Sequence, residues 1–185
     1  MTVRVAAAAT SSPVTLDQAK ARLNILHNDD DTVVTGLIKT ATAEVEAATQ
    51  RRFITQTLEW VLPCWPARSF RLPVATSVRE GFSITIQALG GDTVVLNAAD
   101  FVLSPSDETL SVRPASSASW PALDPDAQEA IVIKFKAGAA TAPDEARTAI
   151  LFLIEYLYAP SPDWKIAASG LPECVEMLIA PLRWE

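Results

Sequence analysis

The spacing of apolar residues changes twice along this 185-residue chain, and these changes constrain its fold more than any single motif. Apolar residues recur at helical spacing over residues 15–52, alternate with polar residues over 54–138, and return to helical spacing over 142–184. The first period predicts amphipathic helices and the second predicts half-buried strands. We therefore predict an α+β fold in one domain, residues 1–185. Two N-terminal and two C-terminal helices form a helical bundle, with a small antiparallel β insert between the two pairs.

The N-terminal helical pair begins at Thr15 with a capping-box signature. Gln18 follows three residues later, so each side chain can accept a hydrogen bond from the other residue's backbone N–H. The first helix carries an apolar stripe of Leu16, Ala19, Leu23 and Leu26. The second helix carries a longer stripe of Val33, Leu37, Ala41, Val45 and Ala48, flanked by Val34 and Ile38. Arg51 and Arg52 are expected in its last turn, where cations complement the helix dipole.

Three consecutive aspartates, Asp29, Asp30 and Asp31, separate the two stripes. We interpret them as side-chain acceptors and negative charge at the start of the second helix. A divalent-metal site is the alternative, but the spacing lacks the glycine and the distal glutamate of a calcium loop. His27, the only histidine, is expected at a helix end and not in catalysis, because no nucleophile motif accompanies it.

The middle of the chain predicts short strands joined by polar turns. Alternating runs surround Gly90-Gly91, which favours a β-hairpin over a phosphate-binding loop, since no Lys-Ser/Thr pair follows. The expected strands lie near residues 54–62, 70–72, 82–87, 93–96, 101–103, 110–112 and 131–136. Residues 114–127 are rich in Ser, Pro and Ala and predict an exposed loop that contains Trp120.

The C-terminal part is again helical. Residues 146–158 are apolar almost all round, so this helix either lies in the middle of the domain or also meets a neighbouring chain. The last helix starts at Pro172 and is ended or kinked by Pro181. The following Arg183-Trp184 pair is typical of interface hot spots, with folding of Trp184 back onto the last helix as the alternative.

Bulk properties exclude several functions. The net charge of −7 disfavours a protein that grips nucleic-acid phosphates. Cys64 and Cys174 are widely separated and predict two plain buried or half-buried thiols. The weakly hydrophobic residues 1–9 indicate a frayed terminus more than a signal peptide, and no apolar run reaches the length of a membrane span. We predict no enzyme activity, no cofactor and no metal site.

The order of these motifs resembles the head-tail connector family of tailed phages and gene transfer agents, also called adaptor or head-completion proteins. The N-terminal part of the resemblance is carried by Thr15, Leu16, Asp17, Ala19, Lys20, Leu23, residues 29–31, Leu37, Ile38, Ala41, Glu44, Glu46, Ile54, Gln56 and Thr57. The C-terminal part is carried by Pro143, Arg147, Ala149, Ile150, Tyr156, Leu171, Pro172, Val175, Leu178, Ile179, Pro181 and Arg183.

The resemblance implies a structural virion protein at the head-tail interface, present in the host cytoplasm during assembly. It implies a homo-oligomeric ring of twelve subunits beneath the portal protein, which extends the DNA channel and docks a tail-completion or stopper protein. DNA would pass through without specific binding. The alternatives are a helix-turn-helix DNA-binding regulator over residues 16–38, which the aspartates disfavour, and more remotely a β-sandwich adhesive or carbohydrate-binding module.

Within this interpretation the candidate contact residues fall into three groups. The portal-contact candidates are Leu178, Ile179, Leu182, Arg183 and Trp184. The ring-contact candidates are Phe152, Tyr156, Tyr158 and Trp120. The channel-facing candidates are Lys134 and Lys136, which share one strand face. The alternative is that this face only contacts solvent.

Overall fold

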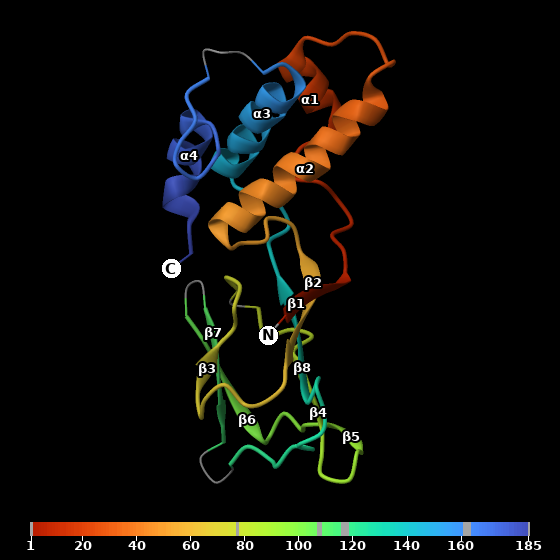
Figure 1. Ribbon diagram of the computed structural model, residues 1–185, viewed down its shortest axis with the longest axis vertical. Helices are drawn as coiled ribbons and strands as arrows, with labels where there is room; N and C mark the ends of the chain where they lie inside the picture. Colours follow the sequence, from red (N-terminus) through yellow and green to blue (C-terminus); the bar gives the residue numbers. More distant parts are fainter. Residues whose placement is uncertain (1, 77, 107–108, 116–118, 161–163, 185) are drawn as a thin grey trace. The chain divides into compact units, whose positions relative to one another are not determined.

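The computed structural model describes residues 2–76, 78–106, 109–115, 119–160 and 164–184, and its chain forms two compact units (Figure 1). The β unit comprises Met1–Thr10 and Thr55–Gly138. The helical unit comprises Ser11–Ile54 and Ala139–Glu185. Each unit is thus built from two separate stretches of the chain, and each has its own architecture.

The helical unit contains four α-helices arranged around α3. Their bounds are α1 (Leu16–Leu23), α2 (Asp31–Thr49), α3 (Asp144–Tyr158) and α4 (Glu173–Ile179), followed by the 3-10 turn η1 (Ala180–Leu182). Helix α3 packs against α1, α2 and α4, which explains why its sequence is apolar on several sides. Its fully buried face consists of Ala146, Ala149, Ile150, Leu153 and Ile154.

Helix α1 starts as predicted and ends earlier than predicted. The Gln18 N–H donates to Thr15 Oγ1 at 3.2 Å, and the Thr15 N–H donates to Gln18 Oε1 at 3.0 Å, which completes the capping box. The helix ends at Leu23 because Asn24 adopts the left-handed conformation, with φ of 56°. The reversal buries Ile25 and exposes Leu26, so the placement of Leu26 on the apolar stripe was wrong.

Helix α2 buries a face that is displaced from the predicted stripe. Its buried residues are Val34, Ile38, Ala41, Val45 and Thr49, whereas Val33 is exposed. The helix ends before Gln50, which is left-handed, so Arg51 and Arg52 lie beyond the last turn and not within it. Arg52 pairs instead with Glu46 at 3.4 Å, and the carboxylate of Glu46 also accepts the Phe53 N–H.

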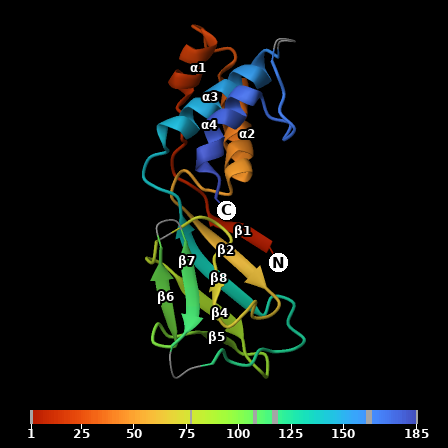
Figure 2. The same cartoon turned by 90° about the vertical axis from the view of Figure 1, so that its left-hand side faces the viewer.

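The β unit holds two antiparallel sheets, so the prediction of a small β insert underestimated its size. The five-stranded sheet has the order β1-β2-β8-β4-β5 and the three-stranded sheet has the order β3-β7-β6 (Figure 2). The first sheet comprises β1 (Thr2–Ala7), β2 (Gln56–Leu62), β8 (Ile131–Ala137), β4 (Ser83–Gln87) and β5 (Thr93–Val95). The second comprises β3 (Phe70–Arg71), β7 (Leu110–Pro114) and β6 (Phe101–Pro105).

One core joins the two sheets. Its largest members come from β2, β8 and β4 on one side and from β3, β6 and β7 on the other, and include Leu58, Trp60, Ile133, Phe135, Ile84, Phe70, Phe101 and Val112. Alternation along each strand shows that one face is buried, but it does not show that a second sheet covers that face. The hairpin between β4 and β5 is confirmed, with φ of 97° at Gly90 and 86° at Gly91.

The N-terminal residues form strand β1, so the prediction of a frayed terminus was wrong. Strand β1 pairs antiparallel with β2, with Val3 opposite Trp60 and Arg4 opposite Glu59. Only Val3 turns toward the core, and the other residues of the strand are exposed. The backbone ladder to β2 therefore holds a segment whose side chains carry little signal for a strand.

Candidate interaction surfaces

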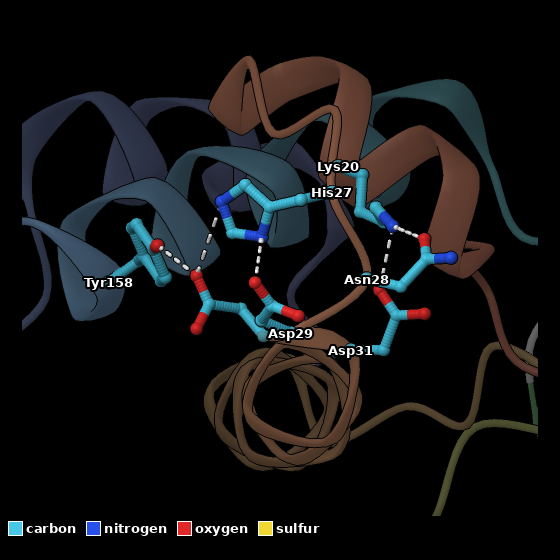
Figure 3. A network of polar contacts seen from close by, with 7 residues as sticks. Lys20, His27, Asn28, Asp29, Asp31 and Tyr158 are labelled. Carbon is cyan, nitrogen blue, oxygen red and sulfur yellow. Dashed lines mark hydrogen bonds and ion pairs between the residues drawn. The ribbon is translucent and has the colours of Figure 1, made fainter.

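The turn between α1 and α2 is held by a network of polar side chains (Figure 3). The Lys20 ammonium lies 2.7 Å from Asp31 Oδ1 and 2.7 Å from Asn28 Oδ1. The two imidazole nitrogens of His27 lie 3.7 Å from Asp29 and 4.0 Å from Asp30. Asp30 occupies the N-cap of α2, but its side chain does not form the predicted capping bond. The aspartates therefore act through ion pairs and charge.

Tyr158 links the end of α3 to this turn. Its hydroxyl donates to Asp30 Oδ2 at 2.8 Å, and Figure 3 draws this bond as the dashed line that begins at Tyr158. The hydrogen bond raises the pKa of Tyr158 above its usual value, with partial burial and the charge of Asp30 as smaller causes. Among the described residues no group of His, Cys, Asp and Glu side chains is arranged to hold a metal ion.

The same turn carries an unusual apolar side chain. Leu26 is 98% exposed, although the flanking Ile25 is buried. The carboxylate side chain of Asp29 is 92% exposed and its recorded ion pair is with His27. The turn therefore presents a leucine beside an accessible negative charge.

A shallow groove lies at the α4 end of the helical unit. It has a volume of about 380 Å³ and is lined by Trp164, Lys165, Glu173, Cys174 and Met177. The Trp164 ring meets Tyr156 edge to face at 5.6 Å, and the Glu173 N–H donates to the Lys165 carbonyl at 2.8 Å. These contacts hold one wall of the groove against α3 and α4.

Sequence reasoning did not single out this groove. Met177 is 78% exposed and lies outside the buried positions Val175 and Ile179 of α4. A methionine at an outward position of an amphipathic helix was the available signal. Both cysteines are free, with Cys174 half-buried as expected and Cys64 exposed, contrary to expectation.

The C-terminal tail folds back onto the end of α2. The backbone N–H of Trp184 donates to the Thr49 carbonyl at 3.0 Å, and the Arg51 guanidinium donates to the Leu182 carbonyl. Arg183 pairs with Glu176 of α4. Trp184 therefore folds back onto the end of α2, and not onto the last helix as the alternative proposed.

The remaining portal candidates differ in accessibility. Leu178 and Leu182 are half-buried. Ile179 is fully buried in the helical unit, so it offers no contact surface in this conformation. Ile179 is buried because it lies one turn after Val175, on the same buried face of α4, whereas the adjacent Leu178 lies on another side of the helix. The indole Nε1 of Trp184 is buried without a hydrogen-bond partner.

Each ring-contact candidate has a partner within its own unit. Phe152 lies under the Arg22 guanidinium at 4.3 Å, and Tyr156 meets Trp164. Trp120 stacks on Trp65 at 4.3 Å, and its Nε1 donates to the Ala67 and Arg68 carbonyls. The predicted loop around Trp120 is thus anchored there, while its residues 116–118 lie outside the described residues. Of this group only Tyr158 is classed as exposed within the helical unit.

Lys134 and Lys136 do share the outward face of β8, but acidic residues share it with them. Lys134 lies directly opposite Glu59 on β2, and the Lys136 ammonium lies 3.1 Å from Glu80. Arg4 on β1 also bonds Glu59, at 2.9 Å, and this hydrogen bond raises the pKa of the guanidinium. The face therefore carries mixed charge and not a basic patch.

Comparison with known proteins shows similarity to a phage connector family over part of the chain. Residues 13–87 match the family model described as phage gp6-like head-tail connector protein. No curated protein sequence matches the chain. Within the described part of the chain, no helix has the length and hydrophobicity that crossing a bilayer requires.

Solved structures share the whole fold. A chain of the neck of an empty gene transfer agent (GTA) particle, computed with C6 symmetry, superposes with a TM-score of 0.79 at 19% identity. A chain of the native GTA virion and a chain of the native GTA neck, computed with C12 symmetry, each give a TM-score of 0.76, at 19% and 18% identity. Each match covers 100% of this chain and 96% of the other.

The match to the family model spans α1, α2 and the strands β2, β3 and β4. These segments contain the predicted capping box, acidic turn and Gln56-Thr57 strand start. Residues 13–87 are thus similar to the phage gp6-like head-tail connector family, and the whole chain shares the fold of the GTA neck chains.

Proposed function

We propose that this connector forms a homo-oligomeric ring in the neck of a tailed-phage or gene transfer agent particle, beneath the portal protein. The ring extends the DNA channel and docks a tail-completion or stopper protein. Support comes from the fold shared over the full chain with GTA neck proteins, one of them in a neck computed with C12 symmetry. We further propose that both units act together as one head-tail adaptor domain.

The ring proposal is tested by native mass spectrometry and negative-stain imaging of the purified protein, with and without a portal ring. A ring of twelve copies bound to the portal is expected. A protein that stays monomeric and leaves the portal unoccupied at high concentration contradicts the proposal. A portal ring mixed with an unrelated acidic protein of similar size is the control.

We assign portal binding to α4 and the tail, through Leu178, Leu182, Arg183 and Trp184. In the described part of the chain the tail is held by the Trp184–Thr49 bond, the Arg51–Leu182 bond and the Arg183–Glu176 ion pair. Binding to the portal would exchange such contacts for intermolecular ones. Truncation after Pro181 is expected to abolish capture of the protein by immobilised portal. Unchanged capture would refute this assignment.

A matched pair of variants separates lost contact from lost folding. Arg183→Glu alters an exposed tail position and is expected to weaken portal binding about tenfold or more, as for an interface hot spot. Lys39→Glu makes the same charge change on an exposed position of α2 and is expected to leave binding unchanged. Lys39→Glu should unfold at the wild-type temperature, and Arg183→Glu, which loses its exposed pair with Glu176, should unfold within a few degrees of it.

We propose that the outward face of β8, with Lys134 and Lys136, lines the DNA channel. The glutamates on this face keep it from holding phosphates tightly, which suits a conduit. Filter binding of duplex DNA at roughly 0.15 M salt is expected to show no retained complex. Glu59→Gln with Glu80→Gln should create measurable, salt-sensitive binding, and Glu145→Gln with Glu173→Gln is the control pair. Tight binding by the wild type would favour a DNA-binding regulator.

A further inference from the structure

We propose that neighbouring copies of this chain contact each other head to tail, with Leu26 of one copy seated in the α4 groove of the next. The α4 groove is the depression lined by Trp164, Lys165, Glu173, Cys174 and Met177. This inference rests on the proposed ring and names the surfaces that would build it. The contact is distinct from the tail surface assigned to the portal.

The Leu26 side chain is a fixed apolar projection. A leucine exposed to 98% leaves almost its whole side chain in water, so its burial at an interface is favourable. The turn that bears it is held by Lys20, which bonds both Asn28 and Asp31, and by the burial of Ile25. A contact made by a preorganised turn loses little conformational freedom on association.

The α4 groove offers a matching apolar depression. Its walls are an indole ring, a thiol and a thioether, and Met177 at its rim is exposed to 78%. Methionine adapts its shape to an inserted side chain, and tryptophan is a common anchor at interfaces. The volume of about 380 Å³ accommodates one aliphatic side chain with neighbouring atoms.

Charges at the two surfaces are complementary. Asp29, three residues after Leu26, extends its carboxylate into solvent. Lys165, on the groove, is exposed and has no ion pair among the described residues. Glu173 lies on the same groove and would repel Asp29, so the favourable orientation sets Asp29 beside Lys165 and away from the start of α4.

The positions of the two surfaces require a ring or filament geometry. Figure 1 shows the α1–α2 turn and α4 at opposite ends of the helical unit. Two different, complementary surfaces at opposite ends of one unit make a heterologous contact, which closes into a ring when the rotation allows it. A two-fold dimer would instead join the same surface of both copies.

A native cysteine allows a direct test. The test uses a Leu26→Cys, Cys64→Ser variant, assembled on the portal and then oxidised. Oxidation should form a disulfide between the thiol introduced at position 26 of one copy and Cys174 of the next, because the proposed contact brings these two thiols together. Non-reducing gels should show a ladder that extends beyond dimers. A product that stops at dimers overturns the head-to-tail contact.

Two control variants test whether the cross-link depends on Cys174 and on position 26. Adding Cys174→Ser should remove it, and Leu89→Cys with Cys64→Ser, at another exposed leucine, should not produce it. Rings seen by imaging without any ladder overturn this inference and leave the proposed ring intact. Failure to form rings at all, even with portal present, overturns both.

Charge exchange provides a second, independent measurement. Asp29→Lys and Lys165→Asp should each weaken ring formation several-fold, and the double variant should recover most of the loss, because the pair is restored with reversed signs. Leu26→Glu should weaken ring formation about tenfold or more. If the double variant loses as much ring formation as the two single variants together, Asp29 and Lys165 do not face each other in the ring.

Discussion

Ile25 and Leu26 are neighbours in sequence, and yet Ile25 is 8% exposed while Leu26 is 98% exposed. The difference arises at Asn24, whose left-handed conformation ends α1 and whose N–H bonds to the carbonyls of Ala21 and Lys20. The Ile25 N–H also donates to Lys20 at 3.0 Å. The turn thereby directs one side chain to the core of the helical unit and the next one to solvent.

Alanine at these two positions should therefore have unequal effects. Ile25→Ala is expected to lower the free energy of unfolding by about 2–4 kcal/mol, as for a buried aliphatic side chain. Leu26→Ala should change it by less than about 0.5 kcal/mol, because the leucine contacts little in the free protein. Urea unfolding followed by circular dichroism measures both, and equal losses would contradict the described turn.

The left-handed caps predict a second pair of outcomes. Asn24→Val should cost roughly 1–2 kcal/mol, because a β-branched residue tolerates this backbone conformation poorly. Gln50→Gly, at the matching cap of α2, should raise the melting temperature, since glycine adopts a positive φ freely. Asn24→Gly is the control and should be nearly neutral. A stabilising valine would show that α1 continues through residue 24.

Tyr158 predicts a dependence of stability on alkaline pH. Its folded-state pKa is raised by the bond to Asp30, so its contribution is complete below the unfolded pKa of about 10 and is lost as pH rises through the folded-state value. The difference in unfolding free energy between wild type and Tyr158→Phe should be constant near neutrality and shrink above about pH 10. Urea titrations at successive pH values measure it.

The control for this prediction is Tyr156→Phe. Tyr156 packs against Trp164, and no hydrogen bond of its hydroxyl is recorded among the described residues. The difference in unfolding free energy between wild type and Tyr156→Phe should not show the decline above about pH 10 that is expected for Tyr158→Phe. A decline of equal size in both comparisons would mean that Tyr158 is not specifically coupled to Asp30.

The Trp65–Trp120 stack predicts a stability effect in the β unit. Trp120→Ala removes the stacked ring and both bonds from its Nε1, and should cost about 2–4 kcal/mol. Trp120→Phe keeps an aromatic ring and should cost only about 1 kcal/mol, the typical worth of the lost hydrogen bonding. Thermal unfolding with near-ultraviolet circular dichroism tests both. An unaffected Trp120→Ala protein would refute the anchoring role.

Local chemistry made several elements readable from the sequence. The Thr15–Gln18 capping box and the Gly90-Gly91 hairpin depend on residues close in the chain, and the structure contains both. The strand β1 escaped prediction because only Val3 contacts the core. Its order comes from backbone pairing with β2, and backbone N–H and C=O groups are the same in every sequence.

The candidate surfaces show the same division. The helical positions of Tyr156 and Tyr158 could be read from periodicity, but their partners Trp164 and Asp30 come from distant segments. The α4 groove requires the fold of residues 164–172 against α4, which no single period encodes. Exposure of Leu26 likewise depended on one backbone angle at Asn24.

By itself the sequence determined where helices, hairpins and their caps begin, because these depend on the period of apolar residues and on hydrogen bonds between near neighbours. Only the tertiary structure decided which face each element buries and which apolar side chains stay in water. That choice depends on packing between segments far apart in the chain, and a small change in where α1 ends was enough to turn Leu26 from core to surface.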